Sequence, residues 1–247
     1  PDPLIPREQT WSVEERVSAK GEIVTMTDEA ALVEIASQIS DKGLRSVAVC
    51  LLNSYANNVN EQCVKKVLER ELPGVHITLS SDIAPQIREY PRTSTTCINA
   101  YSTPFSLPYL TGLTDQVRAE GCDLEPLIML SNGGVVGAKT AALQPVRMIE
   151  SGPAAGALAA GLLSKTYGIS DLISFDMGGT TAKACLIQDG EPLITGEFEV
   201  DRRYRFKPGS GMPITVPSVD MIEIGAGGGS IARVDDLGLL KVGPDSA

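Results

Sequence analysis

The sequence predicts an α/β protein. Two observations carry this prediction: residues 47–80 follow a strand–helix–strand order, and residues 151–187 follow a helix–strand–glycine turn–strand order. Apolar residues make up 43% and charged residues 21% of the 247 residues. This composition is enough to bury the core of one large domain or of two smaller ones.

Residues 27–80 predict a β-α-β unit. An amphipathic helix is expected at Thr27–Ser40, and the apolar run Val47–Leu52 is typical of a strand that is buried on both faces. Asn60–Glu71 predicts a second helix, and Val75–Ser80 predicts the next strand. This spacing indicates parallel strands joined by a right-handed crossover.

The polar stretch at residues 89–99 predicts the start of a further helix. Its four consecutive hydroxyls, Thr93–Thr96, either bond to carbonyl groups of their own helix or bind phosphate, and the first interpretation is favoured. Arg88 and Arg92 lie one helical turn apart, where they form a solvated or salt-bridged face or, less commonly, clamp an anion.

Two prolines, Pro104 and Pro108, are expected to interrupt the chain before a separate helix at Tyr109–Glu120. A short buried strand is expected at Leu127–Leu130. The loop that follows it, residues 131–134, has the position at which α/β proteins bind ligands.

A predicted hairpin near the middle of the chain holds the main candidate binding residues. The run Leu172–Asp176 predicts a buried strand that ends on a carboxylate, and Ala184–Ile187 predicts its partner. Gly178 and Gly179, in the turn between them, permit positive φ and a close approach of backbone N–H groups to an anion. The alternative is an ordinary tight hairpin with a solvated aspartate.

Each residue of this hairpin has a candidate role. The Asp176 carboxylate is placed to hold a metal ion against phosphate oxygens, and Lys183 adds a positive charge if its side chain turns inward. The candidate phosphate-binding residues are Gly178, Gly179, Thr180 and Thr181.

A helix is expected to begin directly before this hairpin, with Ser151 as its N-cap. Gly152, Gly156 and Ala160 recur every four residues and therefore share one helical face. Such a face permits the close approach of either another backbone or a nucleotide, and both alternatives stay open.

The last third of the chain is rich in turns. Pro192–Val200 predicts a strand pair, and the basic, aromatic stretch Asp201–Lys207 predicts an exposed edge strand. An extended segment, Pro217–Ile224, leads into a glycine-rich loop that is not a dinucleotide fingerprint, because Ser230 takes the place of the last glycine. The candidate nucleotide-binding residues of this loop are Gly225, Gly227, Gly228, Gly229 and Ser230.

Composition limits the function further. The net charge of −10 argues against nucleic acid or an anionic membrane as a partner. Five cysteines without C-x-x-C spacing indicate free thiols and a cytoplasmic location, with Cys50 and Cys185 buried in apolar runs. The single histidine, His76, argues against a Ser-His-Asp triad and against a multi-histidine metal site.

Six blocks of sequence follow one another along most of the chain: Glu89–Tyr101, Met129–Gly134, Ser151–Gly156, Asp176–Thr181, Ile224–Ala232 and Val242–Ala247. Together they resemble the hydantoinase A / 5-oxoprolinase family. Within them, residues 147–161 and 175–183 also resemble the connecting helix and the second phosphate hairpin of the actin, sugar-kinase and heat-shock-chaperone ATPase superfamily.

The resemblance implies a ribonuclease-H-like (actin-like ATPase) fold, with a mixed sheet and flanking helices, in a fragment of a larger subunit. Residues 1–90 would be the C-terminal part of the family's N-terminal region, and residues 91–247 the first part of its ATPase-like domain. The implied activity is ATP-dependent hydrolysis of a cyclic amide, such as a hydantoin, N-methylhydantoin or a 5-oxoproline-like lactam. ATP and Mg²⁺ would be the cofactors, Asp176 and Lys183 the catalytic residues, and a hydantoinase B-like subunit the partner.

Three departures from the family pattern matter. Lys183 stands where the oxoprolinase branch has aspartate, and this favours the hydantoinase branch. Asparagines at positions 53, 57, 58 and 60 stand where the family often has histidines. A first Asp-x-Gly-Gly-Thr turn is missing, so we expect an internal fragment that is inactive in isolation. The alternatives are a subunit of an ATP-dependent ketone carboxylase and a non-catalytic assembly module.

Overall fold

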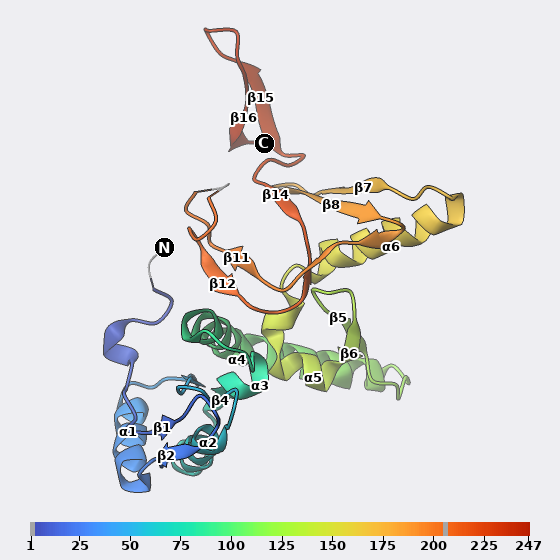
Figure 1. The fold of residues 1–247 in the computed structure, drawn as a ribbon. Helices are drawn as coiled ribbons and strands as arrows, with labels where there is room; N and C mark the ends of the chain where they lie inside the picture. The colour runs from blue at the N-terminus through green and yellow to red at the C-terminus, as the bar shows by residue number, and fades with distance from the viewer. Residues whose placement is uncertain (1–2, 205–206) are drawn as a thin grey trace. The chain divides into compact units, whose positions relative to one another are not determined.

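A computed structural model of the protein describes residues 3–204 and 207–247, and it has a mixed α/β fold (Figure 1). The chain divides into two compact units. The first contains the residues up to Ile128 together with Val136–Met148 and Gly196–Val216, and the second contains Met129–Val135, Ile149–Thr195 and Pro217–Ala247. In the described part of the chain, no helix combines the length and apolar character needed to cross a membrane.

The predicted β-α-β unit is confirmed in the first unit. Strands β3 (Ser46–Val49) and β4 (His76–Leu79) pair in parallel, and helix α2 (Val59–Glu71) connects them. Helix α1 (Glu29–Asp41) begins at Asp28, whose side chain accepts a hydrogen bond from the Ala30 N–H at 3.1 Å. Apolar residues of α1, α2 and both strands form one buried cluster, which includes Leu32, Ile39, Val49, Val64, Leu68 and Leu79.

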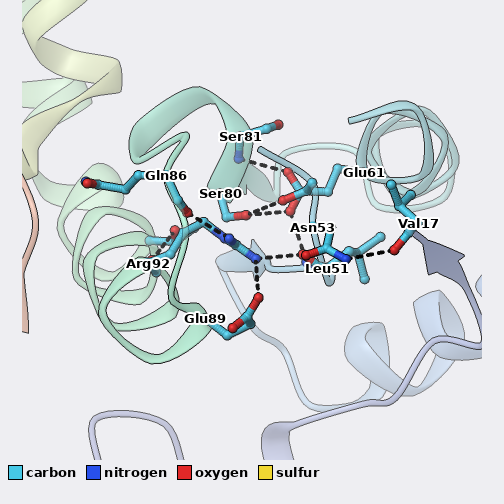
Figure 2. Close-up of polar contacts among 11 residues, drawn as sticks. Val17, Leu51, Asn53, Glu61, Ser80, Ser81, Gln86, Glu89 and Arg92 are labelled. Carbon is cyan, nitrogen blue, oxygen red and sulfur yellow. Dashed lines mark hydrogen bonds and ion pairs between the residues drawn. The ribbon is translucent and has the colours of Figure 1, made fainter. Parts of the chain in front are cut away.

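Two buried charged side chains hold the end of β3 in place (Figure 2). Glu61 of α2 is fully buried and accepts hydrogen bonds from the Leu51 N–H at 3.0 Å, the Ser80 hydroxyl at 2.6 Å and the Ser81 N–H at 2.9 Å. Arg92, which is 1% exposed, donates to the carbonyl groups of Leu51 at 2.8 Å and Gln86 at 2.9 Å. Leu51 is therefore held by a buried carboxylate on one side and a buried guanidinium on the other.

Helix α4 runs without a break over Glu89–Ala119, so the predicted interruption at Pro104 and Pro108 is wrong. Each proline removes one helical N–H donor, but tertiary contacts compensate. The Asn99 amide donates to the Leu143 carbonyl at 3.1 Å, and the Ser106 hydroxyl donates to the Ala142 carbonyl at 3.3 Å. The sequence pattern indicates only the local destabilisation that proline causes in a helix. The hydrogen bonds of Asn99 and Ser106 to residues 142–143 depend on tertiary structure.

The hydroxyls at the start of α4 bond to their own helix, as favoured from the sequence. Thr95 and Thr96 are fully buried and donate to the carbonyl groups of Pro91 and Arg92, each at 2.7 Å. The prediction of a solvated or salt-bridged arginine face is correct only in part for Arg92. Its guanidinium lies 3.9 Å from the Glu89 carboxylate, but it is buried and bonds mainly to carbonyl groups.

The remaining elements of the first unit are short. The pair β11–β12 is antiparallel, as is β1–β2, and β5 pairs with β6. Their bounds are η1 Arg7–Gln9, β1 Arg16–Val17, β2 Ile23–Thr25, α3 Ser80–Ile83, β5 Leu127–Met129, β6 Val135–Gly137, α5 Ala138–Leu143, η2 Pro145–Met148, β11 Phe198–Val200 and β12 Met212–Ile214.

Two predictions for the later segments are wrong. The segment Pro192–Val200 does not pair with itself, because β9, β10 and β11 each pair with a strand from elsewhere in the chain. The predicted edge strand Asp201–Lys207 forms bends at residues 201–204, while Arg205 and Phe206 lie outside the described residues. The partner of β9 is the adjacent strand β8, whereas β10 and β11 pair with strands later in the chain, and composition within the segment identifies none of these partners.

The second unit is built on helix α6 (Ser151–Tyr167) and the antiparallel hairpin of β7 (Leu172–Met177) and β8 (Ala182–Gln188) (Figure 1). Buried Ala154 and Ala157 of α6 pack against Cys185 and Ile187 of β8. The other strands are β9 Glu191–Pro192, β10 Ile194–Thr195, β13 Ser218–Val219, β14 Ile222–Ile224, β15 Ser230–Val234 and β16 Leu240–Ser246, and β14 pairs with β8.

The prediction that residues 172–176 form a buried strand is only partly correct. They form a strand, but Ile173, Phe175 and Met177 are 65%, 57% and 54% exposed. Helix α6 covers the opposite face of the hairpin, and among the described residues β7 is the edge strand of its sheet. An apolar run does not by itself indicate whether one or both faces are covered.

Replacing Glu61 by alanine tests the buried hydrogen bonds around Leu51. We expect Glu61→Ala to lower the free energy of unfolding by about 3 kcal/mol, because the buried Ser80 hydroxyl and the partly buried N–H groups of Leu51 and Ser81 lose their acceptor. The matched control is Glu69→Ala on the same helix, where the side chain is 57% exposed, and we expect a change within about 0.5 kcal/mol. Denaturant unfolding of both variants measures the difference, and equal effects would contradict the role given to Glu61.

Candidate functional site

The turn between β7 and β8 is open and accessible. The Gly178 N–H donates to the Thr181 carbonyl at 2.9 Å and closes the turn, and in register Met177 faces Ala182. Asp176 and residues 178–180 are exposed. Among the described residues, the N–H groups of Gly179 and Thr180 have no hydrogen-bond acceptor. The turn thus presents two free amide donors beside a solvated carboxylate, an arrangement that suits an anion with a bound cation.

The glycine-rich loop 225–230 lies directly against this turn, so the structure brings together two segments that the sequence analysis singled out separately. The Gly228 N–H donates to the Gly178 carbonyl at 2.9 Å, and the Gly229 N–H donates to the Gly179 carbonyl at 2.8 Å. A Cβ atom on Gly227 would lie 2.7 Å from backbone atoms of Gly178 and Gly179. Only a residue without a side chain permits this approach of the two backbones.

The loop is itself held by its own hydroxyl and by the end of β16. The Gly227 N–H donates to the Ser230 hydroxyl at 3.0 Å. The Gly229 carbonyl accepts from the Ala247 N–H at 2.8 Å and from the Ser246 hydroxyl at 3.1 Å. The amides of residues 227–229 are therefore used within the protein, and the loop contributes shape and support to the turn.

Lys183 lies in a row of charges across the sheet. It faces Asp176 on β7 and Glu223 on β14 in register, so the three side chains share one face. Its ammonium group pairs with the Glu150 carboxylate and lies 3.9 Å from a carboxylate oxygen of Glu223. Only 15% of the Lys183 side chain is exposed. Its charge is thus compensated by two carboxylates of the same unit.

Glu150 and Glu223 were not singled out from the sequence. Glu150 directly precedes α6 and has a φ of +66°, in the left-handed region. Glu150, and not Ser151, therefore occupies the N-cap position. The predicted N-cap Ser151 is therefore wrong by one position. The carboxylate of Glu150 does not cap the helix and binds Lys183 instead. No local motif marks this pair, because the partners are 33 residues apart in sequence.

One face of α6 is open and another is packed. A Cβ atom on Gly152 or Gly156 would meet no atom within 4 Å, so this face leaves room for a ligand or another chain segment. Gly161 is different, because a Cβ atom there would lie 2.8 Å from the Gly190 carbonyl oxygen. Close packing of the helix therefore occurs at Gly161, whereas the face of Gly152 and Gly156 is accessible.

The loop that follows β5, residues 131–134, packs against other elements of the second unit. Gly133, at φ +82°, lies against the Leu158 side chain of α6, and the Ser131 carbonyl accepts a hydrogen bond from the Val219 N–H at 2.8 Å. This loop therefore connects α6 and β13 within the second unit.

Burial raises the pKa of the Cys185 thiol beneath the same helix, so this thiol is protonated at neutral pH.

The described residues contain no cluster of three or more His, Cys, Asp or Glu side chains arranged to hold a metal ion. A Mg²⁺ ion needs fewer protein ligands, because it usually keeps several waters and binds one or two carboxylates together with substrate phosphates. The exposed Asp176 carboxylate next to two free amides fits this mode of binding.

Comparison with known protein families places the chain in one of them. The Hydantoinase/oxoprolinase family matches residues 92–247, and the Hydantoinase/oxoprolinase N-terminal region matches residues 1–72. The chain belongs to the hydantoinase/oxoprolinase family. The predicted boundary near residue 90 stays a prediction.

Relatives within the hydantoinase/oxoprolinase family extend along the whole chain. An uncharacterized protein of Methanocaldococcus jannaschii is 42% identical over 100% of the chain and 37% of its own length. Caprolactamase subunit alpha of Pseudomonas jessenii is 32% identical over 99% of the chain and 34% of its own length. The crystal structure of that ATP-dependent caprolactamase superimposes with a TM-score of 0.82 over 100% of the chain and 34% of its own. The chain thus spans about a third of the length of these relatives.

Replacing Gly227 by alanine tests the contact between the loop and the turn in this member of the hydantoinase/oxoprolinase family. We expect Gly227→Ala to lower the free energy of unfolding by about 1–3 kcal/mol, because its methyl group would overlap backbone that has little room to move. In Gly228→Ala the nearest contact of the added Cβ is 3.7 Å, an ordinary packing distance, and we expect a change within about 0.5 kcal/mol. Thermal unfolding compares the two, and equal destabilisation would contradict the contact.

Proposed function

We propose that this chain is the nucleotide-binding part of an ATP-dependent enzyme that opens a cyclic amide, as one portion of a larger subunit. The observation that carries the proposal is the pair of hydrogen-bonded glycine segments beside the exposed Asp176 carboxylate. Family membership supports ATP use, because relatives include an ATP-dependent caprolactamase and a 5-oxoprolinase. The proposal includes an actin-like arrangement in which ATP lies between two lobes.

Each candidate residue receives a role that agrees with its contacts. The free amides of Gly179 and Thr180 donate to phosphate oxygens, with Gly178 and Thr181 shaping the turn. Asp176 holds Mg²⁺, which supplies positive charge against the phosphates. Gly225 and Gly227–Ser230 form the surface along the nucleotide edge through close backbone approach. Lys183, paired with Glu150 and Glu223, positions this row of charges next to the turn.

The chemistry that ATP would perform follows from the stability of amides. Resonance makes an unstrained ring amide slow to hydrolyse, so the carbonyl oxygen must first be activated. In the proposed step, that oxygen attacks the γ-phosphorus, the bond to the β-phosphate oxygen breaks, and ADP leaves. Water then adds to the activated carbon, and the ring nitrogen leaves with a proton, which opens the ring and gives an acyl phosphate. A second water cleaves the acyl phosphate to a carboxylate and phosphate. The protein's part is to orient the phosphate and to neutralise its charge.

A second candidate function, ketone carboxylation, rests on a separate observation. A nucleotide-free acetone carboxylase structure superimposes with a TM-score of 0.81 and 28% identity over 100% of this chain. Acetophenone carboxylase gamma subunit of Aromatoleum aromaticum is 30% identical over 100% of the chain. A ketone enolate attacking the γ-phosphorus would use the same phosphate turn. The latter name is that of a subunit, as is caprolactamase subunit alpha, and this supports a second, hydantoinase B-like subunit as the partner.

Isothermal titration with Mg-ATP tests the binding proposal on the polypeptide encoded by the complete reading frame. We expect one saturable, Mg²⁺-dependent site. In Asp176→Asn the affinity for Mg-ATP should fall at least about tenfold, because the side chain no longer supplies a negative charge to bind the cation. The control is Asp189→Asn, at the opposite end of β8, which leaves binding unchanged. Absence of a saturable site, or unaltered binding in Asp176→Asn, would instead favour a non-catalytic assembly module.

Product analysis distinguishes the two reactions. The complete polypeptide, with its partner subunit, is incubated with ATP and either a lactam or hydantoin, or acetone and labelled bicarbonate. Cyclic-amide hydrolysis predicts ring-opened product and phosphate without label incorporation. Label appearing in an acidic product would overturn the hydrolase proposal and establish the carboxylase alternative.

A further inference from the structure

An open groove in the first unit runs along one edge of strand β3. It has a volume of about 760 Å³, and its lining is mainly apolar. Its floor is the continuous stretch from Leu44 to Leu51, which includes every residue of β3. Because residues of both parities line it, the groove follows the strand edge and not a single face of the sheet.

The backbone of β3 leaves hydrogen-bonding groups at this edge. Strand β4 pairs with β3 on the other side, where the His76 N–H donates to the Arg45 carbonyl at 3.0 Å. Alternation along a strand then directs Val47 and Val49 toward β4. The N–H and C=O groups of Ser46 and Ala48 therefore point into the groove, where no partner strand lies among the described residues.

The walls of the groove come from three helices, from the N-terminal stretch and from one residue of β12. Val64 and Leu68 of α2, residues 3–5, 9–11 and 13, and Met212 all belong to its lining. Leu32 and Ile39 of α1 line one side, and Ser94, Cys97 and Tyr101 of α4 line the other. Tyr90, Tyr101 and Phe105 of α4 also line it, and they are 68%, 57% and 56% exposed. The helices thus extend past the β3 edge of the two-stranded parallel sheet and enclose the groove beside it. Parallel sheets normally have more strands and are covered on both faces.

We propose that this groove receives a further β-strand, supplied by a segment of the same polypeptide outside these 247 residues. The added strand pairs with the free edge of β3 and lies between α1 and α4. A strand forms hydrogen bonds with the backbone groups of Ser46 and Ala48 and also packs side chains against the apolar walls. A compact small molecule does not do both. The relatives are about three times as long as this chain, so such a segment is available in proteins of this kind.

The geometry also sets the chemistry of the added strand. Both of its faces meet apolar walls, so it is a continuous apolar run rather than an alternating one, of the usual length of about five to six residues. A second copy of this chain is disfavoured as the occupant. Its own β3 edge lies equally deep between α1 and α4, and two recessed edges do not reach one another.

Residue-resolved hydrogen exchange on the polypeptide encoded by the complete reading frame tests the proposal. We expect the Ser46 and Ala48 amides to exchange roughly 100-fold or more slowly than free amides, as do Val47 and Val49 that bond to β4. Rapid exchange at Ser46 and Ala48 beside protected Val47 and Val49 would overturn the proposal. Protection that appears only at high protein concentration would overturn it in favour of a second copy, and so would a reading frame limited to these residues.

A groove-filling variant provides an independent check. Ser94→Phe places an aromatic ring in the wall of the groove, so in the complete polypeptide it should speed exchange at Ser46 and Ala48 while leaving Val47 and Val49 protected. The control, Thr111→Phe, lies at an exposed position of α4 outside the groove, and it should change none of the four amides. If Ser94→Phe leaves all four amides as they are in the wild type, no strand occupies the groove.

Discussion

The candidate site depends on two backbone hydrogen bonds between glycine segments that are almost fifty residues apart in sequence. The amides of Gly228 and Gly229 bond to the carbonyl groups of Gly178 and Gly179, and this contact exists only because Gly227 has no side chain. It uses the donors of the loop and leaves those of the turn free. The same contact explains the glycines at positions 227 and 229 of the loop, because a Cβ atom there would lie 2.7 Å and 3.0 Å from backbone atoms of the turn.

Charge at the site is arranged around one lysine. Lys183 is compensated by Glu150 and Glu223, and the third carboxylate of the row, Asp176, remains exposed. Separating a half-buried lysine from its two carboxylates is unfavourable, because the charge would then be desolvated without a partner. Asp176 is therefore the carboxylate of this row that is placed to meet a cation in solvent. In the first unit, a comparable constraint acts on Leu51, which Glu61 and Arg92 hold from opposite sides.

Much of the local structure could be predicted from the sequence. The β-α-β unit, the helix at residue 151, the hairpin and the self-bonded hydroxyls of Thr95 and Thr96 all follow from patterns of neighbouring residues. The errors share one cause. Pro104 and Pro108 lie inside a continuous helix because Asn99 and Ser106 bind a distant segment, and Arg92 is buried because distant carbonyl groups accept its hydrogen bonds. Local patterns contain no information about such partners.

The sequence by itself determined which segments carry glycine, hydroxyl and carboxylate groups, and that the family signature lies in them. These are properties of short stretches of chain, and they depend on spacing and composition alone. Only the tertiary structure decided which of these segments meet: the turn at Gly178 lies against the loop at Gly228, the ammonium of Lys183 has two partners, and the edge of β3 is open. Contacts between residues far apart in sequence depend on how the elements pack, and no local pattern specifies that packing.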